Sequence, residues 1–330
     1  MTRYSVGGKS EFASIEVSAD LAGGVSVVVP VYNSEATLPL LIARLEGVLR
    51  GLTQHYEAIL VNDGSRDGSW EAVKRLAQTH GWVRGFNLMR NFGQHNALLC
   101  GIRAARYAFI VTIDDDLQNP PEEIPKLLDE LNRGFDVVYG PPEKEQHGLL
   151  RDLASVITKL VLQKTMGAAT ARKISAFRVF RTRLRQAFAN YQSPYVSIDV
   201  LLTWGTAKFS SVSVRHDARA SGISNYTLGK LLVHALNMFT GFSTWPLRLA
   251  SVIGFAFTFF GVGVLAYVLG RYLLQGTTVA GFPFLASIIA IFSGAQLFAL
   301  GLIGEYLARL HSRMMERPVY AVLEETSQAE

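Results

Sequence analysis

The first half of the chain alternates short apolar runs with stretches of helical length. The apolar runs predict strands at 25–31, 57–62, 82–89, 108–113 and 135–139. Helical patterns follow the first run as far as residue 50 and then cover 69–79, 94–106 and 122–133. Short strands that alternate with helices predict an α/β domain whose sheet is mainly parallel and carries helices on both faces. In such sheets, ligands bind beyond the carboxyl ends of the strands.

Two amphipathic stretches follow residue 140. Each places apolar residues on one helical stripe, the first at 151–166 and the second at 228–245. One interpretation is a pair of helices that pack on the core. The other is a pair of helices that lie in a membrane interface, which the neighbouring apolar segment favours.

The segment from Leu249 to Gly304 contains a single charged residue, Arg271. A bilayer span needs about 20 apolar residues, so the segment predicts a transmembrane hairpin with spans at 249–274 and 282–304. The alternative is a buried helical pair in a soluble protein. Arginines flank the outer ends of the hairpin, and by the positive-inside rule both termini and the sheet domain are cytoplasmic. These arginines are Arg248, Arg309, Arg313 and Arg317.

These patterns divide the chain into five segments. They are an N-terminal extension (1–23), the sheet domain (24–227), a juxtamembrane amphipathic helix (228–245), the transmembrane hairpin (246–308) and a cytoplasmic C-terminal tail (309–330).

Charge and composition agree with a membrane protein. The formal net charge is +5, the pI is about 9.3 and the mean hydropathy is +0.21. A basic chain suits either nucleic acid or an anionic membrane surface. Because the apolar hairpin favours the membrane, we expect no nucleic-acid partner. The single cysteine, Cys100, rules out an intramolecular disulfide and is expected to be a small buried residue.

Acidic residues cluster where the strand at 108–113 ends. Clustered carboxylates are costly there unless a cation lies among them, and hard oxygen ligands suit Mg²⁺ or Mn²⁺. In extended backbone Asp114, Asp116 and Gln118 point the same way. The middle residue, Asp115, is therefore expected to have another role.

Several motifs resemble those of family 2 glycosyltransferases with a GT-A fold. The C-terminal part is similar to the polyprenyl-phosphate glycosyltransferases, and most similar to their branch of undecaprenyl-phosphate 4-deoxy-4-formamido-L-arabinose transferases. The motifs are PVYNSE (30–35), VNDGSRDGS (61–69), RNFGQH (90–95), IDDDLQNPPEEIP (113–125), GLIGEYLARL (301–310) and RPVY (317–320).

This resemblance implies a donor site. Pro30, Tyr32 and Glu35 would line the nucleotide pocket, and Asp63 would bind the base or the ribose. The alternative for Asp63 is an Asx-turn that caps the following helix. The resemblance also implies that Asp114, Asp116 and Gln118 hold the metal and the donor diphosphate, with Asp114 and Asp116 as catalytic residues.

The acceptor side departs from the family pattern at one position. Several members carry an aspartate, discussed there as a catalytic base, where this chain has Ala176. A phosphate monoester acceptor is largely ionised at neutral pH, because its second pKa is near 6, so it needs positioning more than deprotonation. Arg178 is the leading candidate for a catalytic residue that grips this phosphate. The alternative for Arg178 is a surface ion pair.

A polar loop resembles an Arg-x-x-Gly-x-Ser-x-Tyr pattern of the arabinose-type members. By that resemblance, Arg219, Ser224 and Tyr226 would close on the donor and the lipid phosphate.

The resemblance implies inverting, metal-dependent transfer from a nucleotide-sugar, UDP-linked by similarity to bacterial members, to polyprenyl (undecaprenyl) phosphate. The expected location is a bacterial inner membrane, the expected product serves cell-envelope glycan or lipid A modification, and members of the family form tetramers. A processive polysaccharide synthase of the same superfamily is one alternative, but it would carry a Gln-x-x-Arg-Trp motif and more spans. An inactive glycosyltransferase-like scaffold is the other, and the intact acidic motif argues against it.

Overall fold

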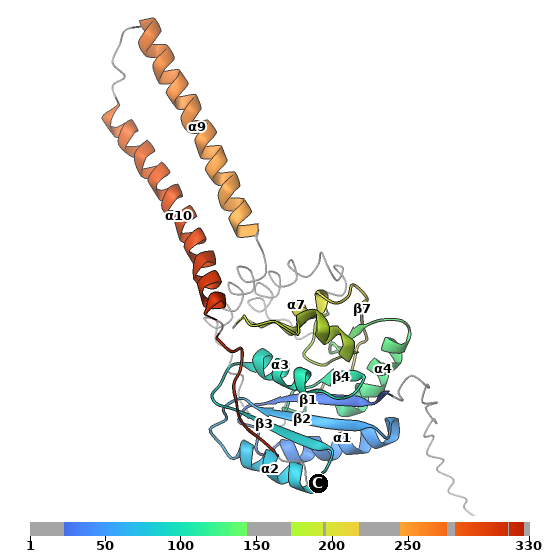
Figure 1. The fold of residues 1–330 in the computed structure, drawn as a ribbon. Coiled ribbons are helices and arrows are strands. Elements are labelled where there is room, and N and C mark those ends of the chain that lie inside the picture. Colours follow the sequence, from blue (N-terminus) through green and yellow to red (C-terminus); the bar gives the residue numbers. More distant parts are fainter. Residues whose placement is uncertain are drawn as a thin grey trace, which may run out of the picture.

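The computed structural model describes residues 23–143, 173–193, 196–217, 245–275, 281–315 and 317–326. Its centre is an eight-stranded sheet in the order β7-β5-β6-β4-β1-β2-β3-β8 (Figure 1). The strands are β1 (Val25–Val31), β2 (Tyr56–Asn62), β3 (Val83–Leu88), β4 (Phe109–Thr112), β5 (Val137–Tyr139), β6 (Arg178–Arg181), β7 (Phe209–Ser211) and β8 (Val322–Glu325).

The helices lie mostly between these strands. They are α1 (Leu38–Leu52), α2 (Ser69–Thr79), α3 (Gln94–Ala104), α4 (Ile124–Asn132), α7 (Ile198–Thr203), α9 (Trp245–Gln275) and α10 (Phe282–Met314). Two 3₁₀ helices, η2 (Pro121–Glu123) and η3 (Thr182–Phe188), complete the sheet domain.

The mainly parallel sheet predicted from the sequence is confirmed. Strands β4, β1, β2 and β3 are parallel neighbours, and β5 pairs in parallel with β7. Strand β6 is antiparallel to both β4 and β5, and β8 is antiparallel to β3. The five predicted strands are β1 to β5, whereas β6 and β7 were not predicted. A strand after Pro318 was considered only as one exchanged between subunits, and β8 lies in that segment.

Two hydrophobic cores lie on opposite faces of the sheet. Because side chains alternate along a strand, Val27 of β1 joins the core under α1, α2 and α4 together with Leu45. Its neighbour Val28 joins the core under α3 and α7 together with Leu98. Helix α3 approaches the sheet closely at Gly101, where an added Cβ would lie 2.4 Å from a Val28 methyl carbon.

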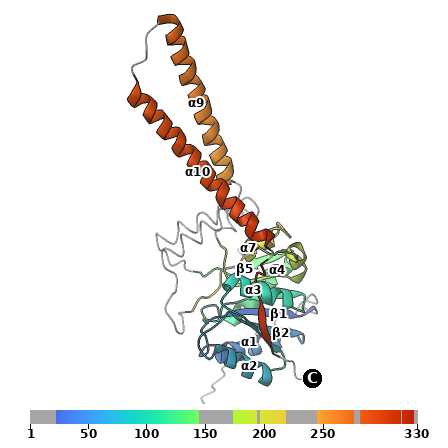
Figure 2. The same cartoon turned by 60° about the vertical axis from the view of Figure 1, so that its left-hand side comes forward.

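Helices α9 and α10 form an antiparallel hairpin that projects from the side of the sheet carrying α3 and α7 (Figures 1 and 2). In α9 the stretch Ala250–Arg271 is long and apolar enough to cross a membrane, and its 18-residue apolar window has a mean hydropathy of 2.2 and is not buried in the protein. Helix α10 covers the second predicted span, but its apolar stretch, within the described residues, is the shorter Phe292–Ala308. One candidate span is therefore found, and crossing by α10 stays a prediction.

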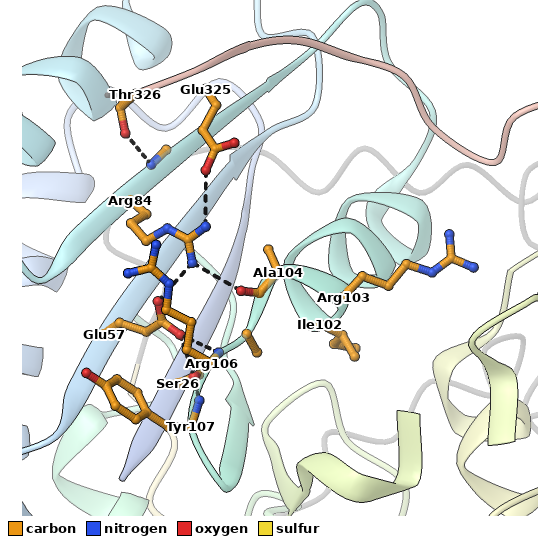
Figure 3. A network of polar contacts seen from close by, with 12 residues as sticks. Ser26, Glu57, Arg84, Ile102, Arg103, Ala104, Arg106, Tyr107, Glu325 and Thr326 are labelled. Carbon is orange, nitrogen blue, oxygen red and sulfur yellow. Dashed lines mark hydrogen bonds and ion pairs between the residues drawn. The ribbon is translucent and has the colours of Figure 1, made fainter. Parts of the chain in front are cut away.

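After the hairpin the chain returns to the sheet, where β8 runs beside β3. Figure 3 shows the polar network that fixes it. The buried guanidinium of Arg84, on β3, donates to Glu57 of β2 and to Glu325 of β8, each at 3.1 Å. Next to this ion pair, the Thr326 hydroxyl accepts a hydrogen bond from the backbone N–H of Gly85 at 2.9 Å. Residues 322–326 are therefore held to the sheet by both side chains and backbone.

Several predicted segments lie outside the described residues. They include the N-terminal extension up to residue 22, the amphipathic stretch at 151–166 and the juxtamembrane helix up to residue 244. The loop residues Arg219, Ser224 and Tyr226 lie outside as well. Their predicted roles therefore stay predictions.

Candidate active site

The candidate site is built where β1, β2 and β4 end at the same edge of the sheet. The chain turns sharply there, and Asn33 (φ 54°) and Leu117 (φ 62°) are the non-glycine residues with positive φ in the described part of the chain. Such backbone is costly and clusters at functional sites. The segments after β1 and β4 therefore have special local geometry at the edge where a ligand is expected.

The three consecutive aspartates after β4 accept hydrogen bonds from different parts of the chain. Asp114 accepts a hydrogen bond from the Gln94 side chain at 2.7 Å. Asp115 accepts bonds from the Tyr32 backbone at 3.0 Å and from the Ser34 hydroxyl. Asp116 accepts a bond from the backbone N–H of Gln118 at 3.1 Å.

The separate role predicted for Asp115 is confirmed, because its carboxylate fixes the loop after β1. Burial raises the pKa of Asp115, and the neighbouring charge of Asp116 adds to this effect. The reasoning from extended backbone was wrong, however. Strand β4 ends at Thr112, and the left-handed Leu117 breaks the alternation that would align Asp114, Asp116 and Gln118.

A pocket of about 560 Å³ lies beside these carboxylates. Glu35 and Asp116, from two predicted motifs, both line it, together with Asp67 and Arg75. Burial acts to raise the pKa of Asp67, but hydrogen bonds from Ser69 and from the Glu35 backbone outweigh it and lower the pKa. The lining thus offers several hydrogen-bond acceptors and one guanidinium, which suits a polar ligand rich in hydroxyl and amide groups.

Asp63 is buried, with 3% of its surface exposed. Its two carboxylate oxygens accept hydrogen bonds from the backbone N–H groups of Phe92 and Gly93, at 2.7 and 2.8 Å. Burial raises the pKa of Asp63, and these bonds oppose that effect. The residue therefore fixes the loop that leads into α3 and to Gln94, and its predicted contact with the base or ribose stays a prediction.

The other two predicted donor residues lie on β1 or just after it. Pro30 is buried in β1 beside Val61 of β2. Tyr32 is 39% exposed, and its backbone is fixed by Asp115. Tyr32 is thus the more accessible of the two for contact with a ligand.

Arg178 lies at the start of β6 and is 2% exposed. Its guanidinium forms an ion pair with Asp199 of α7 and donates to the Thr112 hydroxyl at 3.0 Å. Asp199 also accepts a bond from the Tyr139 hydroxyl at 3.0 Å. Burial acts to lower the pKa of Arg178, but the charge of Asp199 outweighs it and raises the pKa. Arg178 does form an ion pair, but the pair is buried. The alternative of an ion pair at the surface is therefore wrong in its location.

Asp199 was missed in the sequence. It is the second residue of a six-residue helix, and nothing in its local pattern marks it as a functional residue. Contact of Arg178 with an acceptor phosphate stays a prediction, and the partners of its guanidinium favour a role inside the domain.

The carboxylates after β4 fit a divalent cation by their chemistry. Asp114 and Asp116 are both partly exposed, and Gln118 adds an amide oxygen. No cluster of three or more His, Cys, Asp or Glu side chains that could hold a metal occurs among the described residues. Mg²⁺ sites with one or two carboxylates are completed by substrate phosphates and water, so two carboxylates suffice if a diphosphate binds here.

Known proteins match both the sequence and the fold. The model of the family described as "Glycosyl transferase family 2" matches residues 26–190. The undecaprenyl-phosphate 4-deoxy-4-formamido-L-arabinose transferase of Aeromonas hydrophila is 36% identical over 303 residues, which cover 90% of this chain and 92% of the relative. That of Photorhabdus laumondii is 36% identical over 301 residues, which cover 90% and 93%.

Among solved structures, the fold resembles glucosyl-3-phosphoglycerate synthase of Mycobacterium tuberculosis in complex with Mn²⁺, UDP-glucose and phosphoglyceric acid. The TM-score is 0.53 at 20% identity, and the match covers 71% of this chain and 83% of that one. This similarity supports the fold.

Proposed function

Because this chain belongs to glycosyl transferase family 2, we propose that it transfers a sugar from a UDP-sugar to undecaprenyl phosphate and inverts the anomeric carbon. The observation that carries the proposal is the 36% identity with undecaprenyl-phosphate sugar transferases over 303 residues. A match that covers 90% of the chain must include α9 as well as the sheet. The product would be a polyprenyl-monophosphate sugar for cell-envelope glycan or lipid A modification.

The donor would bind at the pocket beside Glu35 and Asp116. Asp114, Asp116 and Gln118 would hold Mg²⁺ or Mn²⁺, which supplies positive charge to offset the charge that develops on the nucleoside diphosphate leaving group. Asp115 keeps the loop after β1 in place for the nucleotide. Pro30, Tyr32 and Asp63 complete the proposed nucleotide side.

The acceptor needs little help to lose a proton. Its phosphate is mostly a dianion at neutral pH, because the second pKa is near 6. The absence of a carboxylate side chain at Ala176 is therefore compatible with attack by the phosphate oxygen on the anomeric carbon. Arg219, Ser224 and Tyr226 are the proposed contacts on this side.

Membrane attachment follows from the chemistry of the acceptor. A polyprenyl tail stays in the bilayer, so the site must lie at the interface where the phosphate is. Helix α9 has the length and apolar character to cross a membrane. We propose that α9 and α10 both cross a bacterial inner membrane, that both termini are cytoplasmic, and that the chain forms a homo-oligomer.

The test is transfer by the purified full-length chain in detergent. UDP-sugars are screened with Mn²⁺ and undecaprenyl phosphate, and the lipid product is identified by mass. A lipid carrying one sugar is expected. Chains of several sugars would support the processive synthase instead, and no product from any donor would support the inactive scaffold.

A further inference from the structure

Behind the end of β4 that carries the proposed metal ligands lies a buried ion pair that the reaction described above does not use. Arg178 of β6 and Asp199 of α7 form it, with side chains 2% and 13% exposed. Tyr139 of β5 donates to the same carboxylate oxygen of Asp199. The pair thus connects three elements of the sheet domain.

This ion pair lies next to the proposed metal site. Arg178 pairs with Thr112 in the ladder between β4 and β6 and donates to its hydroxyl. Thr112 is two residues before Asp114. The charge of Asp114 also contributes to the raised pKa of Arg178, in keeping with the contact between Arg178 and Thr112.

A buried guanidinium needs an anionic partner, because loss of the partner leaves an uncompensated charge. Among the residues that the structure describes, Arg178 binds the carboxylate of Asp199, and the charge of Asp114 also acts on its guanidinium. Position 176, two residues before Arg178 in the sequence, carries no carboxylate. If Asp199 were neutral, Asp114 would be the remaining acidic partner within the described part of the chain.

We propose that Asp199 is a positioning residue for the metal site: by holding Arg178, it keeps the guanidinium from pairing with Asp114 and leaves Asp114 to a divalent cation. This inference rests on the proposed metal-dependent binding of the donor. Asp199 does not touch the donor in this account, and it acts through Arg178.

Two variants that break the same ion pair test this idea by titration calorimetry of Mn²⁺ into the full-length chain with UDP. Asp199→Asn releases the guanidinium, so Mn²⁺ binding should weaken by about tenfold or more, as is typical for groups that orient metal ligands. Arg178→Gln removes the competitor, so Mn²⁺ binding should be unchanged or tighter. A purely structural role predicts weakening in both.

The double variant Asp199→Asn/Arg178→Gln is the control and should bind Mn²⁺ as the wild type does. The double variant also tests the inference if Asp199→Asn alone does not fold. Weak Mn²⁺ binding by the double variant would overturn the inference. Equal weakening in both single variants would overturn it too. A wild-type chain that binds no Mn²⁺ with UDP would instead overturn the proposed donor chemistry, and this inference with it.

Discussion

Asp115 accepts a hydrogen bond from the backbone N–H of Tyr32 at 3.0 Å, although 83 positions separate the two residues in the sequence. The bond joins the segment after β4 to the segment after β1. It ties the middle carboxylate of the acidic motif to the loop after β1, whereas the flanking Asp114 and Asp116 accept hydrogen bonds from Gln94 and Gln118.

The first prediction concerns Asp116. If Asp116 binds the cation as proposed, Asp116→Asn should lower metal-dependent turnover by on the order of 10²-fold or more, because it removes a negative charge from the metal site near the leaving group. Turnover of the lipid product is measured across a Mn²⁺ series. Asp129→Asn, which changes an exposed carboxylate on α4, should behave as the wild type. Full activity of Asp116→Asn in chelator-treated buffer contradicts the metal assignment.

The second prediction concerns Ala176. If the acceptor phosphate attacks as a dianion, Ala176→Asp should give no gain in turnover, and the acidic limb of the rate profile should lie near pH 6 in both proteins. A new carboxylate would also lie two positions from Arg178 in the sequence and compete for its guanidinium. Steady-state kinetics from about pH 5 to pH 8 checks this, and a large rate increase would show that the acceptor needs a protein base.

The third prediction concerns the network in Figure 3. Arg84→Met leaves the buried carboxylate of Glu57 without its ionic partner, which should cost about 3–5 kcal/mol of stability. Glu325→Gln changes a carboxylate that is 49% exposed and should cost at most about 1 kcal/mol. Thermal unfolding of both variants in detergent compares them. Equal losses of stability in the two variants would mean that the burial of Glu57 does not determine the cost of removing its ionic partner.

The fourth prediction is a dependence of stability on pH. Burial acts to raise the pKa of Asp136, but hydrogen bonds from Thr206 and Arg183 outweigh it and lower the pKa. A lowered folded-state pKa adds stability above the ordinary value of about 3.9, and this stability is lost as the pH falls through the folded-state pKa. Asp136→Asn should therefore melt below the wild type at about pH 7, and the gap should shrink toward about pH 3. A constant gap would contradict the electrostatic origin.

The fifth prediction concerns topology. If both α9 and α10 cross the membrane, reporters fused at Glu330 and inserted at Gly276 should lie on opposite sides. The arginines at the outer ends of the hairpin favour a cytoplasmic C-terminus. A periplasmic reporter at Glu330 would contradict this orientation.

The sequence predicted the centre of the fold well, because these elements carry strong periodic patterns. The bounds of β1 and α2 agree with the predicted 25–31 and 69–79. Strands β4 and β5 are as short as β6, β7 and β8 but are buried along their whole length. Strands β6, β7 and β8 lack a clear pattern because polar or charged residues interrupt their short apolar runs. In β8 all four side chains are exposed, so no apolar pattern marks it.

The predicted motifs lie together at one edge of the sheet, but the directions of their side chains were not predicted. The carboxyl ends of parallel strands meet at one edge, so the motifs around Tyr32 and Asp115 were expected to lie together. The direction of each aspartate depends on the turn at Leu117, which the pattern of strand residues does not contain. Asp199 comes from a distant helix and acts through contacts with Tyr139 and Arg178 that exist only in the folded chain.

The return of β8 to the sheet means that the hairpin is inserted within the domain it anchors. Residues before α9 supply seven strands, and the eighth comes from residues after α10. A fragment that stops before α9 would therefore expose the hydrogen-bonding groups of β3 along an open edge, which invites pairing with other chains. A fragment that holds only the residues before α9 should be prone to aggregation unless the β8 segment is supplied with it.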